Sequence, residues 1–138
     1  MFARNLTGLR GAVAAAALYA GGLLAPASAQ APALAMLSAL DDGQWELRFR
    51  DGAPARRVCV RSGLELIQLQ HADSGCNRFV VEDGANVVTV QYTCRGNGYG
   101  RTSVRRENAS LVQIDSQGIA SGLPFQFSAE ARRLGACR

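Results

Sequence analysis

Four cysteines in a chain of 138 residues restrict the possible fold more than any other feature of this sequence. An even number of cysteines in a small exported domain is typical of a disulfide framework. Zinc sites built from cysteine usually contain C-x-x-C pairs, and the sequence has no such pair. We therefore expect two disulfides and no cysteine-bound metal. The residues involved are Cys59, Cys76, Cys94 and Cys137.

Four cysteines allow three pairings. We favour Cys59–Cys76 together with Cys94–Cys137, which close loops of about 18 and about 44 residues. In the chain-entropy model such loops contribute roughly 3 and 4 kcal/mol, a large part of the ~5–15 kcal/mol that usually stabilises a domain. The other two pairings stay open.

The N-terminus has the three parts of a secretory signal peptide. Arg4 and Arg10 supply positive charge, residues 11–24 form an uncharged apolar run, and residues 25–29 supply the small side chains of a cleavage site. The apolar run, about 14 residues, is shorter than the ~20 that span a bilayer. We expect a signal peptide over residues 1–29, cleavage after Ala29, and a periplasmic location.

The mature chain divides into two parts. We expect residues 30–42 to form either a short helix or an N-terminal tail, and residues 43–138 to form a single β domain stapled by disulfides. Without Arg4 and Arg10 the chain has 13 arginines and 11 acidic residues. This weak positive balance gives no reason to expect nucleic acid as a partner. No segment after the signal peptide is long and apolar enough to span a membrane.

Alternation of apolar and polar residues predicts a series of strands. The first runs from Gln44, with Trp45, Leu47 and Phe49 on one face, and a turn joins it to a second strand. The other strands are predicted at residues 57–60, 78–82, 87–94, 102–107, 111–117 and 124–132. The expected fold is mainly β, an antiparallel meander of about seven strands that forms a bent sheet or small open barrel with one short helix.

Two connections carry local signals. Ser62 and Glu65 match a capping box, which predicts a helix over residues 63–70. Residues 96–100 are rich in glycine, but they lie between two predicted strands and not before a helix. We therefore interpret them as a long hairpin loop and not as a phosphate-binding loop.

The order of several features resembles the family of small exported proteobacterial proteins catalogued as domain of unknown function 3617. The matching features are Gly43-x-Trp45-Glu46, Cys59 followed by a short helix, Cys76, Tyr92-x-Cys94 followed by glycines, Gly118, and the ending at residues 131–137. The resemblance spans about residues 43–137. It implies an exported β-rich domain with two disulfides, and it implies no reaction, ligand or catalytic residue.

Catalysis has two candidate sources in this sequence. His71 is the one histidine, and Asp73 and Ser74 follow it closely. Such neighbours are typical of a helix end, but a triad is defined by three-dimensional geometry, so a hydrolase using His71 stays open. A carboxylate pair is the second source. Its candidates are Asp41, Asp42, Glu46, Glu82, Asp83, Glu107, Asp115 and Glu130. We assign no catalytic residue, no cofactor and no metal ligand.

Arginines on strand faces are candidate contacts for a ligand or partner. The candidates are Arg48, Arg50, Arg101 and Arg105. If they converge, they form a patch for an anionic envelope component such as lipopolysaccharide phosphates or cell-wall carboxylates. The alternative is an ordinary solvated sheet face on which arginines form cross-strand ion pairs with Glu46, Glu107 and Glu130.

A concave sheet face around Trp45 and Tyr92 is a second candidate binding surface, suited to a small apolar ligand. We therefore predict a non-enzymatic periplasmic binding or envelope-interaction module, with a small periplasmic hydrolase as the alternative. A third class, an oligomeric structural protein, would be marked by an exposed apolar edge strand.

Overall fold

The computed structural model describes residues 34–72 and 75–138. The predicted signal peptide, residues 1–29, lies outside the described residues. Within them, no helix has the length and apolar character needed to cross a membrane.

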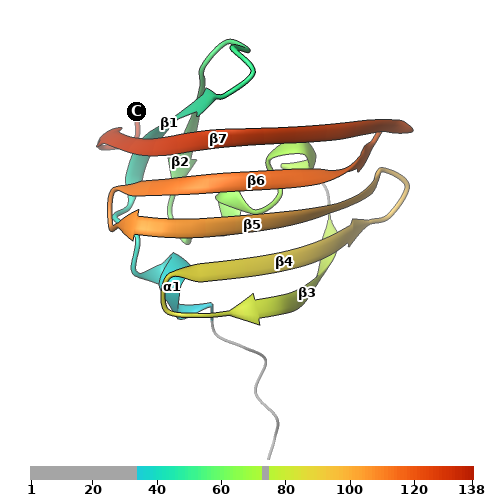
Figure 1. Ribbon diagram of the computed structural model, residues 1–138, viewed down its shortest axis with the longest axis horizontal. Coiled ribbons are helices and arrows are strands. Elements are labelled where there is room, and N and C mark those ends of the chain that lie inside the picture. The colour runs from blue at the N-terminus through green and yellow to red at the C-terminus, as the bar shows by residue number, and fades with distance from the viewer. Residues whose placement is uncertain (1–33, 73–74) are drawn as a thin grey trace, which may run out of the picture.

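Seven antiparallel strands form one open sheet, which confirms the predicted mainly β fold. The strands are β1 (Gly43–Phe49), β2 (Arg56–Val60), β3 (Cys76–Asp83), β4 (Val87–Cys94), β5 (Gly98–Asn108), β6 (Leu111–Ala120) and β7 (Leu123–Gly135). Their order is β2-β1-β7-β6-β5-β4-β3, so the first hairpin joins the end of the meander through a β1–β7 pair. The β1–β2 hairpin and the meander from β3 to β7 are visible in Figure 1.

The sheet has one buried face, called the inner face here. Alternate residues of each strand point to it, as the period of two requires; in β4 these are Val88, Val90, Tyr92 and Cys94, all buried. Helix α1 (Ala35–Ser38) and the 3-10 turns η1 (Leu64–Leu66) and η2 (Leu69–His71) cover this face. In the view of Figure 1 the 3-10 turns lie behind β5 and β6.

The two phenylalanines of β7, Phe125 and Phe127, are both half-buried. The Phe127 ring centroid lies 5.4 Å from that of Phe49 in an edge-to-face arrangement. The Phe125 ring centroid lies 6.0 Å from that of His71. These contacts extend the core towards the turn between β6 and β7.

The segment before β1 belongs to the core. Met36 and Leu37 of α1 are buried, and the Leu34 amide donates to the Asp83 carboxylate at 3.4 Å. The Asp41 amide donates to the Ala109 carbonyl at 2.8 Å, and the Trp45 indole donates to the Asp41 carbonyl at 2.9 Å. Residues 34–41 are thus attached to both β1 and the β5–β6 turn.

The helix predicted over residues 63–70 is wrong as a single α-helix, because the segment forms the two short 3-10 turns instead. Its carbonyls bond to other parts of the protein. The Ile67 carbonyl accepts from the Thr102 hydroxyl, and the Leu69 carbonyl accepts from Arg56 at 2.9 Å. The capping-box contact itself is present, since the Ser62 amide donates to the Glu65 carboxylate at 3.3 Å.

The favoured disulfide pairing is also wrong. The disulfides are Cys59–Cys137 and Cys76–Cys94, with Cα atoms 5.6 Å and 4.1 Å apart. Cys76 faces Cys94 directly in the β3–β4 register. Gln44 of β1 pairs with Cys59 on one side and with Gly135 on the other, which brings Cys137 near Cys59. Strand register, and not loop length, sets the pairing.

The glycine-rich connection is shorter than the long loop predicted over residues 96–100, because β5 begins at Gly98. Gly100 pairs with Tyr92 across the β4–β5 hairpin. A Cβ atom at Gly100 would lie 2.3 Å from the Tyr92 hydroxyl oxygen. Glycine is therefore required there to admit the tyrosine ring.

Candidate functional site

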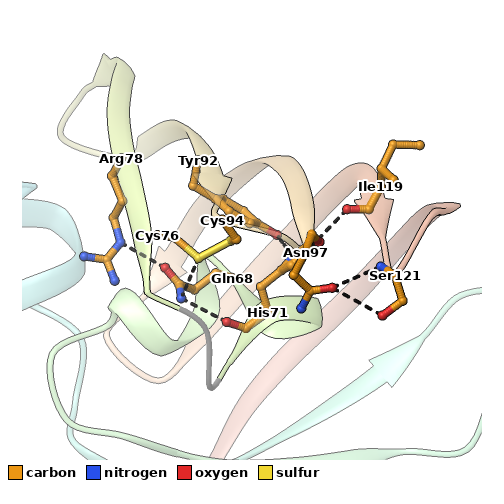
Figure 2. Close-up of a disulfide and its surroundings, with 9 residues drawn as sticks. All are labelled: Gln68, His71, Cys76, Arg78, Tyr92, Cys94, Asn97, Ile119 and Ser121. Atoms are coloured by element: carbon orange, nitrogen blue, oxygen red, sulfur yellow. Dashed lines mark hydrogen bonds between the residues drawn. A yellow bond between two sulfur atoms is a disulfide. The ribbon is translucent and has the colours of Figure 1, made fainter.

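His71 lies in a buried polar cluster beside the Cys76–Cys94 disulfide (Figure 2). Its side chain is 2% exposed. Nε2 lies 2.7 Å from the Asn97 carbonyl oxygen and 3.1 Å from that of Ile119. Two acceptors require a donor, so we assign the proton to Nε2. Nδ1 then accepts from the Tyr92 hydroxyl at 3.1 Å.

This cluster connects several segments of the fold. Gln68 donates to the His71 carbonyl at 3.1 Å, and Arg78 donates to the Gln68 side-chain oxygen at 3.1 Å. The Asn97 side-chain oxygen accepts from both the amide and the hydroxyl of Ser121. Burial raises the pKa of Tyr92 to about 12. The tyrosine hydroxyl therefore keeps its proton over a wide pH range, and it donates a hydrogen bond to Nδ1 of His71.

The position of His71 bears on the hydrolase alternative. Both ring nitrogens are engaged by Tyr92 and by backbone carbonyls. Among residues 34–72 and 75–138, no serine hydroxyl bonds to the imidazole. Asp73 and Ser74 lie outside the described residues. The described contacts are those of a side chain that anchors the 3-10 turns to the sheet.

The candidate carboxylates are mostly engaged by arginine or hydroxyl groups. Glu46 pairs with Arg48 at 2.9 Å, and the Asp115 carboxylate accepts from the Ser128 hydroxyl. A hydrogen bond from Gln113, together with the charge of Arg132, lowers the pKa of Glu130. A general acid for glycoside hydrolysis needs the opposite shift. In the described part of the chain, no three histidine, cysteine or acidic side chains gather closely enough to hold a metal ion.

Trp45 and Tyr92, the predicted apolar contacts, belong to the protein core. Their exposed fractions are 0% and 1%. A small ligand at either ring would have to displace core side chains. The edge strand β3 instead carries exposed apolar residues, Phe79 and Val81, on a part of the sheet with one paired neighbour.

Three of the four predicted arginines have partners within the protein. Arg48 pairs with Glu46, and Arg105 pairs with Glu107 at 3.3 Å. Arg50 donates to the Gln113 side-chain oxygen at 3.0 Å. Arg48 and Arg105 thus form ion pairs within their own strands and not the cross-strand pairs that were the alternative to an anion-binding patch, and Arg50 has a neutral partner. Exposed pairs of this kind contribute little to stability.

Arg101 differs from these three arginines. It lies on β5 between buried Gly100 and Thr102, so its side chain points to the outer face of the sheet. Within residues 34–72 and 75–138 its guanidinium has neither a carboxylate within ion-pair distance nor a hydrogen-bond partner.

The strand register places Arg101 in a row of polar side chains on the outer face. Directly paired residues share a face in an antiparallel sheet. Gln91 of β4 pairs with Arg101, Arg101 pairs with Gln117 of β6, and Gln117 pairs with Gln126 of β7. Phe79 of β3 pairs with Gln91 and ends the row at the sheet edge. All five residues are exposed.

A shallow groove of about 550 Å³ runs over this row. It is lined by the three glutamines, Arg101 and Tyr99, among other residues. The Tyr99 side chain is 51% exposed. The groove continues over the next row, where Ser103 pairs with Asp115 and Asp115 pairs with Ser128. We call the two parts together the Arg101 groove.

Sequence reasoning identified Arg101 but missed the three glutamines and Tyr99 as its neighbours. The signal was present in part, because each glutamine occupies an outward position of its strand. Their assembly into one row depends on register, which alternation alone does not supply.

Comparisons with protein-family models, with curated proteins and with solved structures find no match for this chain. The resemblance to domain of unknown function 3617 therefore stays a prediction that rests on the order of sequence features.

Proposed function

We propose that this protein is a non-enzymatic binding module of the bacterial periplasm, and that the Arg101 groove binds an anionic component of the cell envelope. One observation carries this proposal. Arg101 has no carboxylate partner among the described residues, and it lies in a groove between glutamines that make no side-chain hydrogen bond there.

The chemistry of the groove suits an anion. Arginine presents several N–H donors in a planar arrangement that matches carboxylate and phosphate oxygens. Gln91, Gln117 and Gln126 add further donors and acceptors beside it. Because no protein carboxylate pairs with this guanidinium in the described part of the chain, a ligand anion does not have to displace one.

The location follows from different observations. The two disulfides support an oxidising compartment. The signal peptide predicted over residues 1–29 supports export. Together they favour the periplasm, where anionic polymers of the envelope are accessible.

Sedimentation of the protein with purified lipopolysaccharide and with purified peptidoglycan tests the proposal. We expect binding at low salt that weakens at several hundred millimolar salt and is lost in Arg101→Gln. The matched control is Arg48→Gln, because Arg48 is exposed on the same sheet but pairs with Glu46. Binding of Arg101→Gln at the wild-type level would overturn the proposal.

Self-association is a second candidate, favoured by the exposed apolar residues of β3. An edge strand with exposed Phe79 and Val81 has the features of a pairing surface. Sedimentation velocity of wild type and Val81→Lys tests it: a dimer lost in the variant would support self-association, and a monomeric wild type would exclude it.

A further inference from the structure

We infer that the ligand of the Arg101 groove is a saccharide that carries a carboxylate on a sugar unit, with a sugar ring stacked on Tyr99 and the carboxylate bound by Arg101. This inference rests on the proposed function and specifies the chemical class of the ligand. The charge, the aromatic ring and the amides of the groove each support it.

The charged residues of the groove favour a ligand that places a single negative charge next to Arg101. Among the described residues that line it, two are charged, Arg101 and Asp115. They lie in neighbouring rows, since Arg101 pairs with Gln117 and Ser103 pairs with Asp115. One guanidinium compensates one carboxylate. A doubly charged phosphate would carry excess charge close to the Asp115 carboxylate, which repels it.

The aromatic side chain supplies an apolar surface next to this charge. Tyr99 and Arg101 are two residues apart on β5 and both point outward, which places them about 7 Å apart along the strand. Half of the Tyr99 side chain is open to solvent. A pyranose ring has apolar C–H faces that pack on aromatic rings, while its substituents extend sideways to polar groups. A simple inorganic anion would make no use of this ring.

The glutamines provide the remaining recognition elements. An amide both donates and accepts hydrogen bonds, as a sugar hydroxyl does. Gln91, Gln117 and Gln126 lie on successive strands to either side of Arg101. Neighbouring strands are ~4.8 Å apart, similar to the width of a pyranose ring. Asp115 accepts from Ser128 and retains acceptor capacity for a further hydroxyl.

Calorimetric titration with matched sugars tests the inference. The probes are trigalacturonic acid, its fully methyl-esterified form, the N-acetylglucosaminyl–N-acetylmuramic acid disaccharide, and inorganic phosphate. We expect wild type to bind the acid trimer about tenfold more tightly than the ester. In Arg101→Gln this difference disappears. In Tyr99→Ala the acid and the ester both bind more weakly by a similar factor, and Arg48→Gln behaves as wild type.

The outcomes separate this inference from the proposed function. Tighter binding of the disaccharide than of the trimer would identify a cell-wall source for the carboxylated sugar, and the reverse would identify a uronic-acid glycan. Equal binding of acid and ester, or tighter binding of phosphate than of either acidic sugar, would overturn the inference. If lipopolysaccharide or peptidoglycan binding still depends on Arg101 in that case, the proposed function stands. If Arg101→Gln changes neither experiment, both fail.

Discussion

The buried polar side chains below the inner face of the sheet differ from those of the Arg101 groove on its outer face. On the inner face, buried polar groups such as His71, Thr102 and Gln68 all have hydrogen-bond partners. No buried side-chain nitrogen or oxygen of the described residues lacks one. On the outer face of β4 to β7, Arg101 and its neighbouring glutamines have no such partners in the described part of the chain.

This difference separates residues that hold the fold together from residues available to a ligand. A buried polar group without a partner costs about 1–3 kcal/mol, so the inner face has to satisfy its own. An exposed group is satisfied by water and can exchange that water for a ligand. Changes on the inner face should therefore alter stability, and changes in the Arg101 groove should alter binding.

Loss of a disulfide should have the largest effect on stability. Cys59–Cys137 joins residues 78 apart and Cys76–Cys94 joins residues 18 apart. In the chain-entropy model their removal costs about 4.5 and about 3 kcal/mol. We expect the double variant Cys59→Ser/Cys137→Ser to unfold at lower urea concentration than Cys76→Ser/Cys94→Ser. The reverse order would show that the buried packing of Cys94 outweighs loop closure.

Gly100→Ala should have the next largest effect, because the added Cβ atom would overlap the Tyr92 hydroxyl. Tyr92 is buried and cannot move aside. Overpacking of this kind costs about 1–3 kcal/mol, measurable by urea denaturation. The control is Gly135→Ala, whose Cβ atom would meet no atom within 4 Å. Equal stabilities of the two variants would contradict the close approach at Gly100.

Tyr92→Phe should change the response to alkaline pH. The native tyrosine keeps its proton up to about pH 12, whereas a free tyrosine loses it near pH 10.0. Between these values the unfolded state binds fewer protons, so wild-type stability falls as pH rises, by about 3 kcal/mol at most. The variant lacks this contribution and should show a flatter profile over the same range. At neutral pH it should lose about 1 kcal/mol with the hydrogen bond to His71. Parallel profiles above pH 10 would contradict the assignment.

Arg101→Gln should have the smallest effect on stability, below about 0.5 kcal/mol, because an exposed side chain without partners contributes little. The same substitution should abolish envelope binding. Thermal unfolding measured beside sedimentation separates the two effects. A clear loss of stability in this variant would place Arg101 with the structural residues and end the distinction between the two faces.

Much of the fold could be predicted from the alternation of apolar and polar residues and from the turn residues. All seven strands were predicted, and Trp45, Leu47 and Phe49 of β1 were assigned to one face. The pairing of β1 with β7 was not predicted, since nothing local in either strand indicates its partner. The error at residues 63–70 has the same origin. Thr102, 35 positions away, bonds to the Ile67 carbonyl in place of a helical amide.

Less of the candidate site than of the fold could be predicted from the sequence. Arg101 was identified among four arginines, but the sequence treated them alike. Arg50 donates a hydrogen bond to Gln113, 63 residues away, whereas the Arg101 side chain has no partner among the described residues. Such differences between similar residues depend on which strands become neighbours.

The sequence by itself determined which side chains of each strand point inward, because the period of two is a local property of an extended backbone. It also determined that the cysteines would form disulfides, provided the chain is exported. Only the tertiary structure set the pairing of those cysteines and the row around Arg101. Both depend on the register between strands, which is set by contacts between residues far apart in the chain.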